Sequence, residues 1–139
     1  MKLSTKIDKL KVGTNILEIE VPDKLRQRHR SGLVYFDDAL GGRGFTPSCV
    51  SLFTGTPGAG KTTMMLELAD SLTGHGHVCL FNTAEESLYQ LKMTVERLRL
   101  RHGFAAGQET YVPRLLENCE ILRKKHPKKA FFLIVDSLQ

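Results

Sequence analysis

The second half of the chain alternates short apolar runs with longer stretches in which apolar residues recur every three to four positions. The short runs cover residues 49–53, 78–81 and 131–135, and most of their side chains favour β-structure. They predict three strands. The last run, Phe131-Phe132-Leu133-Ile134-Val135, contains no polar residue, as is typical of a strand covered on both faces.

Three helices are predicted around these strands. The first begins after Lys61 and stops at Gly74-His75-Gly76, with apolar residues at helical spacing at Met64, Met65, Leu68, Ala69 and Leu72. Ser87 is a suitable cap for the second helix, whose apolar face contains Leu88, Leu91, Val95 and Leu98. Pro113 fits the first turn of the third helix, which carries Leu115, Leu116, Cys119 and Leu122. Alternating strands and helices predict an α/β fold with a mainly parallel sheet.

The front of the chain shows a weaker pattern. Leu17, Ile19 and Val21 alternate with acidic residues, which predicts a strand over residues 16–21 that ends at Pro22. Phe36 and Leu40 suit a short helix, and the glycines at 41–44 with Pro47 predict a turn after it.

The composition indicates an ordinary globular domain. Hydrophobic residues make up 41% and charged residues 25% of the 139 positions. No apolar run approaches the ~20 residues of a membrane span, and the first residues lack the apolar stretch of a secretory signal. We therefore expect a cytoplasmic protein without a membrane partner.

The net charge of +5 and the pI near 9.2 allow an anionic partner. The excess is concentrated at the front, at Lys24, Arg26, Arg28, His29 and Arg30. We interpret residues 1–30 as a basic N-terminal arm. It is either a solvated arm or a DNA contact, and both readings remain open.

The three cysteines, Cys49, Cys79 and Cys119, are widely spaced and form no CxxC pair. This spacing supports neither a disulfide framework nor a zinc site. We expect all three to be buried as small apolar side chains.

The strongest chemical signal is a glycine-rich loop. Gly55-Thr56-Pro57-Gly58-Ala59-Gly60-Lys61-Thr62 matches GxxxxGK[ST] in full, between a predicted strand and a predicted helix. The glycines allow backbone N–H groups to converge on phosphate oxygens, and the helix amino terminus adds partial positive charge. We expect this segment, together with Thr63, to bind ATP, with Lys61 on the β- and γ-phosphates and the Thr62 hydroxyl on Mg²⁺.

Carboxylates at two strand ends complete the predicted site. Asp136 ends the strand at 131–135 and is the expected Walker B ligand of Mg²⁺. Because Ser137 follows it, the base that activates water must lie elsewhere. Glu85 and Glu86 follow the strand at 78–81, at the edge where open α/β sheets bind ligands. A carboxylate there can deprotonate the attacking water, although the pair could also simply begin a helix.

These residues together resemble the RecA-like ATPase superfamily, and within it the RadA (Sms) family of bacterial DNA-repair ATPases. The resemblance runs from about Arg30 to Gln139. It includes Ser31-Gly32-Leu33, Asp37, Leu40-Gly41-Gly42, the phosphate loop, Glu85-Glu86-Ser87 and Val135-Asp136-Ser137-Leu138-Gln139. It implies that Glu85 is the general base and that Glu86 is the second acid of the RadA and KaiC branches.

Two departures from that family stand out. The family's N-terminal four-cysteine zinc module has no counterpart here, and the sequence ends just after the Walker B strand. The resemblance implies that the DNA-binding loops, a basic residue acting on a neighbouring subunit's ATP, and a strand inserted between those at 49–53 and 131–135 all follow that point. We therefore expect residues 31–139 to be the front half of a RecA-like core, incomplete at the C-terminus, and a weak or inactive ATPase alone.

The resulting hypothesis is an ATPase that acts with DNA, single-stranded or branched, in a ring or filament of identical subunits. Lys61, Glu85 and Glu86 are its catalytic candidates. One alternative is a KaiC-like regulatory ATPase that acts on proteins. Another is a module that binds ATP without hydrolysing it.

Overall fold

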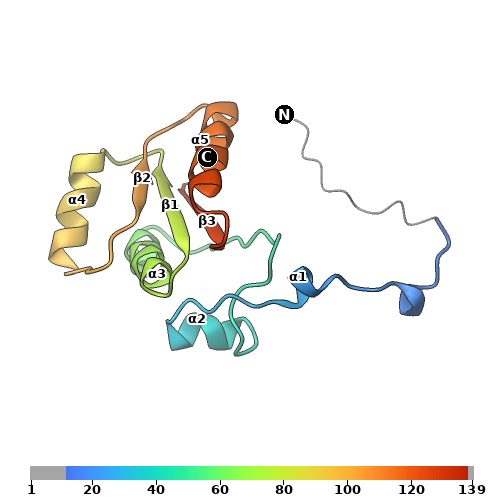
Figure 1. Ribbon diagram of the computed structural model, residues 1–139. Helices are drawn as coiled ribbons and strands as arrows, with labels where there is room; N and C mark the ends of the chain where they lie inside the picture. Colours follow the sequence, from blue (N-terminus) through green and yellow to red (C-terminus); the bar gives the residue numbers. More distant parts are fainter. Residues whose placement is uncertain (1–11, 138–139) are drawn as a thin grey trace.

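The computed structural model describes residues 12–137 and builds them around a three-stranded, all-parallel sheet (Figure 1). β1 (Val78–Thr83) is the central strand, with β2 (Ala105–Gly107) on one side and β3 (Phe131–Asp136) on the other. The predicted strands at 78–81 and 131–135 are confirmed, each slightly longer at its carboxyl end. Part of the predicted N-terminal arm, residues 1–11, and the last two residues of the resemblance, Leu138-Gln139, lie outside the described residues.

The three predicted helices are confirmed as α3 (Lys61–Gly74), α4 (Leu88–Arg97) and α5 (Val112–Lys125). Ser87 caps α4 in a capping box: its hydroxyl accepts the Gln90 N–H, and the Gln90 side chain accepts the Ser87 N–H at 3.0 Å. Pro113 lies in the first turn of α5, as predicted. The starts of α4 and α5 are determined by residues next to them in the sequence, which is why sequence analysis could locate them.

The order of the strands places α4 and α5 on opposite faces of the sheet. The connection through α4 runs from β1 outward to β2, and the connection through α5 runs back across β1 to β3. Parallel crossovers are right-handed, so two connections in opposite directions cover opposite faces. The side chains of β1 support this arrangement. Cys79 and Phe81 point to the face covered by α3 and belong to the core cluster, whereas Leu80, on the other face, lines a groove with Leu115 of α5.

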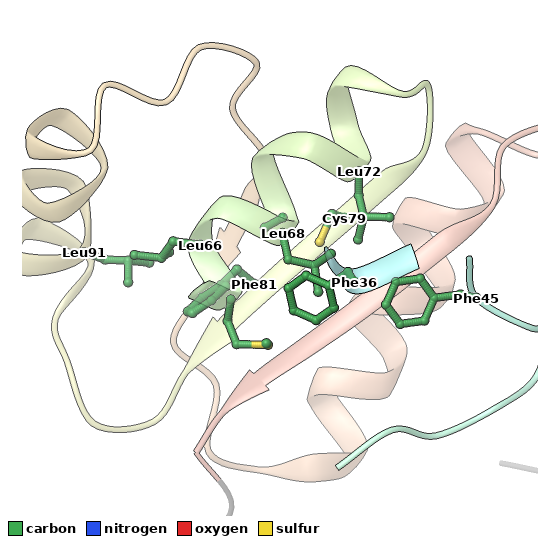
Figure 2. Packing of buried hydrophobic residues seen from close by; sticks show 10 residues of the cluster. Phe36, Phe45, Leu66, Leu68, Leu72, Cys79, Phe81 and Leu91 are labelled. Carbon is green, nitrogen blue, oxygen red and sulfur yellow. The ribbon is translucent and has the colours of Figure 1, made fainter. Parts of the chain in front are cut away.

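The core lies between α3 and the sheet (Figure 2). Leu66 and Leu72 of α3 and Phe81 of β1 are completely buried, and Leu91 extends the cluster to α4. Phe36 and Phe45 add side chains from the front of the chain, which explains how α2 (Val34–Ala39), the short helix expected near Phe36, docks under α3.

Two predicted strands are wrong. Residues 16–21 contain η1 (Ile16–Glu18), a 3-10 turn capped by the Asn15 side chain, and α1 (Asp23–Arg26) follows. Residues 49–53 belong to no strand, and Val50 and Leu52 are largely exposed. The physical reason is the same in both places: β-structure needs a neighbouring ladder, and no described strand lies beside either segment. The prediction that β3 is covered on both faces is also wrong, since it is an edge strand and Leu133 is exposed.

The cysteine prediction holds for one residue of three. Cys79 is buried in β1, and burial raises the pKa of its thiol to about 12, so it behaves as a small apolar side chain. Cys119 is half-buried, and burial raises its pKa too. Cys49 is exposed, because the segment that carries it does not enter the sheet.

The turn predicted at residues 41–44 is present and returns the chain toward its own start. Gly41 and Gly42 both have positive φ, and the Gly42 N–H donates to the Asp37 carbonyl at 2.7 Å. His29 and Phe45 then exchange two backbone hydrogen bonds in an isolated antiparallel bridge. Within residues 12–137, no helix is long and apolar enough to cross a bilayer.

Candidate nucleotide-binding and catalytic site

The phosphate loop is an exposed turn that ends in the first turn of α3. Gly58 and Gly60 have φ of 78° and 85°, a region that only glycine enters without strain. The Ala59 N–H donates to the Thr56 carbonyl at 3.1 Å and closes the turn. No side chain caps the amino end of α3, so its first N–H groups are available to an anion.

Lys61 lies over this loop. Its ammonium donates to the carbonyl oxygens of Gly55 at 2.8 Å and Thr56 at 3.1 Å. A side chain at position 55 would contact the Lys61 stem, since an added Cβ lies 3.5 Å from it. The ammonium therefore sits where the backbone N–H groups of the loop can share an anion with it.

Thr62 and Asp136 meet although 74 positions separate them in the sequence. The Thr62 hydroxyl donates to the Asp136 carboxylate at 2.6 Å, in a partly buried position. α3 supplies the first residue and the carboxyl end of β3 supplies the second. The residues predicted to bind Mg²⁺ are thus brought together.

The donor set suits a hard cation. Mg²⁺ prefers oxygen ligands and is usually bound through one or two carboxylates together with phosphate oxygens and water. A hydroxyl and a carboxylate beside an anion-binding helix terminus fit that requirement. Among the described residues, no group of three or more His, Cys, Asp or Glu side chains is placed to hold a metal ion.

Glu85 and Glu86 face different surroundings. The Glu85 carboxylate accepts a hydrogen bond from the Ser137 hydroxyl, directly after Asp136. Glu86 is tied to Thr83 through its backbone, and its side chain lines a groove on α4 with Gln90 and Met93. Of the two candidate bases, only Glu85 is hydrogen-bonded beside the Thr62–Asp136 pair.

The end of β3 is joined to β1 beyond the last ladder pair. Thr83 pairs with Asp136, and the Ala84 N–H donates to the Asp136 carbonyl at 2.9 Å. Through these bonds, the loop that carries Glu85 stays next to the strand end that carries Asp136.

Sequence reasoning missed two buried polar anchors. Asn82 bonds the backbone of Glu109 in both directions, at 2.9 and 3.0 Å, and so fixes β2 against β1. Asp70 of α3 accepts the backbone N–H groups of Arg101, His102 and Gly103. A signal was available for Asn82, because it is a polar residue on the strand face that otherwise carries Val78 and Leu80.

Comparison with known proteins finds curated relatives over most of the chain. It is 36% identical over 110 residues to the DNA repair protein RadA of Campylobacter jejuni. The aligned region covers 74% of this chain and 22% of the relative. It is 34% identical over 113 residues to the DNA repair proteins RadA of Streptococcus pyogenes and Escherichia coli, covering 81% of this chain and 23% of each relative. The chain thus spans less than a quarter of the length of these relatives. No protein-family model matches it.

Proposed function

Because the chain is homologous over about three quarters of its length to DNA repair proteins named RadA, which implies a RecA-like core, we propose that it binds ATP with Mg²⁺ as part of a RadA-like DNA-repair ATPase. The observation that carries this proposal is the 2.6 Å hydrogen bond between Thr62 and Asp136. It joins the end of the phosphate loop to the strand end that the Walker B prediction selects.

Each residue has a defined role in this proposal. Backbone N–H groups of residues 55–63 hold the phosphates, and Lys61 leaves its two carbonyl partners to contact them. Thr62 and Asp136 hold Mg²⁺, which offsets negative charge on the phosphate oxygens. Glu85 orients and deprotonates the attacking water, and the Ser137 hydroxyl holds its carboxylate beside Asp136.

The proposal includes two partners. DNA is the partner that the relatives' names suggest, and further copies of the chain in a ring or filament are what the RecA-like resemblance implies. Both partners are proposed only because of the RadA-like role, so evidence against that role would remove them. ATP binding, in contrast, can be tested on this chain directly.

A second candidate function is ATP binding without hydrolysis. The observation that favours it is the position of residues 49–60, which are exposed and outside any strand. A loop without a strand behind it is less firmly placed than one between a strand and a helix. Single-turnover hydrolysis with excess protein separates the candidates, because a binding module returns intact ATP.

Calorimetric titration with ATP and Mg²⁺ tests the primary proposal. Lys61→Ala removes a charged contact to phosphate and should weaken binding by about 1.5–3 kcal/mol, or roughly 10- to 150-fold. Lys92→Ala is a matched control, since Lys92 is an exposed lysine on α4 that pairs only with Glu96. Equal affinity of a folded Lys61→Ala protein and the unmodified chain would refute the role of the loop.

A further inference from the structure

The edge of the sheet opposite the candidate site carries eight of the 20 lysine and arginine residues of the chain. Residues 97–104 precede β2 and residues 123–130 precede β3, and neither segment contains an acidic residue. Because the strands are parallel, both segments lie at the amino ends of the strands, which we call the amino edge (Figure 1). Its cations are Arg97, Arg99, Arg101, Arg123, Lys124, Lys125, Lys128 and Lys129.

Both segments contact the start of the central strand or the helix that leads into it. The Val78 N–H, at the start of β1, donates to the Ala130 carbonyl at 2.9 Å. On the other side, the His102 ring packs against Gly74, where an added Cβ would lie 2.6 Å from the ring. With neighbouring strands ~4.8 Å apart, the two basic segments therefore flank the start of β1, about 10 Å from each other.

The backbone of each segment is held in place while its cations stay exposed. Leu98 and Leu100 pack against the core, and Asp70 accepts three consecutive N–H groups from residues 101–103. In the second segment, the Lys129 N–H closes a turn onto the His126 carbonyl at 3.1 Å. All eight cationic residues are exposed, so a rigid scaffold presents them to a ligand.

Little in the described part of the chain neutralises this charge. Among residues 12–137, Arg123 is the one member of the set with an ion pair, to Glu120 at 2.9 Å. Helix dipoles account for cations in the last turns of α4 and α5. They do not account for the four that follow the helices: Arg99, Arg101, Lys128 and Lys129.

Arg99 is unusual in its backbone as well. It follows the C-cap of α4 with φ of 55°, and the Leu100 N–H donates to the Val95 carbonyl as in a glycine-terminated helix end. A non-glycine residue is strained in this conformation. An exposed, unpaired arginine thus occupies a position where glycine would be more stable.

From this arrangement we infer that the amino edge binds the phosphate backbone of a nucleic acid. None of the large exposed apolar side chains of residues 12–137 lies in 97–104 or 123–130. Membrane binding requires apolar side chains that insert beside the cations, and protein interfaces have an apolar centre. A purely cationic surface without exposed aromatics matches sequence-independent phosphate contacts.

The choice of nucleic acid over other polyanions rests in part on the proposed DNA-repair role, whereas the site itself does not use the ATP-binding residues. Lys61, Glu85 and Asp136 belong to the phosphate loop and to the carboxyl ends of the strands. Failure of one proposal is therefore distinguishable from failure of the other.

Two charge-matched variants test the inference. The edge variant carries Arg99→Gly, Arg101→Gln and Lys128→Gln. The control variant carries Arg43→Gln, Lys92→Gln and Arg114→Gln, which lie outside both the amino edge and the basic N-terminal arm. Each lowers the formal net charge of +5 by three, and thermal melting verifies that both fold. The probes are a fluorescent oligothymidylate, a fluorescent mixed-sequence duplex and phosphatidylserine vesicles.

We expect the edge variant to bind the duplex at least about tenfold more weakly, with a salt slope of log K reduced by about 2 to 3, since each phosphate contact contributes about 0.9. The control variant should change the slope by less than about 1. ATP affinity should stay the same in both. Equal losses in the two variants, a larger loss in the control, or binding to vesicles but to neither nucleic acid would overturn the inference.

The single variant Arg99→Gly tests whether weaker binding results from the lost cation and not from loss of folding. Glycine suits φ of 55° at this position, so this variant should fold while it loses one cation. We expect weaker duplex binding and a slope lower by about 0.9. An unchanged slope in a stable Arg99→Gly protein contradicts the assignment of this residue.

Discussion

The two edges of the parallel sheet carry opposite kinds of side chain, although the same three strands form both. At the carboxyl edge, hydroxyls and carboxylates from distant parts of the chain bond one another, as in the pairs Thr62–Asp136 and Ser137–Glu85. At the amino edge, the backbone makes the long-range bonds, through Asp70 and Ala130, and within residues 12–137 Arg123 is the one cation of the set with an ion pair. The first arrangement fixes the positions of a few reactive groups, and the second presents many cations without pairing most of them.

This difference explains why the edges suit different ligands. Chemistry on a phosphate requires groups held within a narrow geometry, which side-chain hydrogen bonds provide. Binding along a phosphate backbone requires charge density and tolerates motion of each cation. The four predictions below test whether the edges are independent in this way, beginning with the largest expected effect.

Glu85→Gln should separate catalysis from binding at the carboxyl edge. In a complete RadA-like protein that contains this chain, loss of the base should lower the hydrolysis rate by about 10²- to 10⁴-fold, while ATP affinity stays within about twofold, because the loop is unchanged. Single-turnover hydrolysis and calorimetry measure the two quantities. Glu86→Gln is the matched control, since Glu86 lies against α4. If Glu86→Gln inactivates and Glu85→Gln does not, the base is assigned wrongly by one residue.

Asp70→Ala should damage the amino edge and spare the carboxyl edge. The change leaves three backbone N–H groups without their acceptor, which should lower the free energy of unfolding by about 1–3 kcal/mol. Urea denaturation measures the loss. Asp70→Asn keeps one acceptor oxygen and should lose less. Equal stability of Asp70→Ala and the unmodified chain contradicts the role of Asp70 as the anchor of residues 101–103.

Arg99→Gly should move stability and nucleic-acid binding in opposite directions. Relief of the positive φ should raise the free energy of unfolding by about 0.5–1 kcal/mol, even as duplex affinity falls. Arg97→Gly provides the contrast, because glycine within the last turn of α4 should destabilise by a similar amount. A destabilised Arg99→Gly protein would show that the arginine contributes packing that outweighs its strain.

His77 should produce a small pH dependence of stability. Burial, and to a lesser extent the charges of His29 and His75, lowers the pKa of His77 from 6.5, against the hydrogen bond that its ring donates to the Arg30 carbonyl. The unfolded chain therefore binds more protons, so the contribution of His77 is fully present above pH 6.5 and is lost as the pH falls through the lowered folded-state value. Denaturation of His77→Gln between pH 5 and 8, with the unmodified chain in parallel, measures it. If the free energy of unfolding of His77→Gln falls at low pH as much as that of the unmodified chain, groups other than His77 cause the fall.

Local patterns were reliable where a residue and its immediate neighbours decide the conformation. Ser87 and Gln90 cap α4 through contacts three positions apart, and the positive φ of Gly58 and Gly60 follows from the absence of a side chain. The strand at 49–53 shows the limit, because its composition favours β-structure while the ladder it needs depends on another part of the chain. β2 shows the converse, since Ala105–Gly107 has no β-favouring composition and becomes a strand through its pairing with β1.

The sequence by itself thus determined the phosphate loop, both ends of α3, the starts of α4 and α5, and the strands that became β1 and β3. Only the tertiary structure decided that Thr62 donates to Asp136, that Ser137 holds Glu85 beside them, and that two separate basic segments share one edge. Helix caps and turns need a few neighbouring residues, whose contacts form at little cost in chain entropy. Contacts across 74 positions form only when the whole sheet assembles, because the free energy that closes such long loops comes from the shared core.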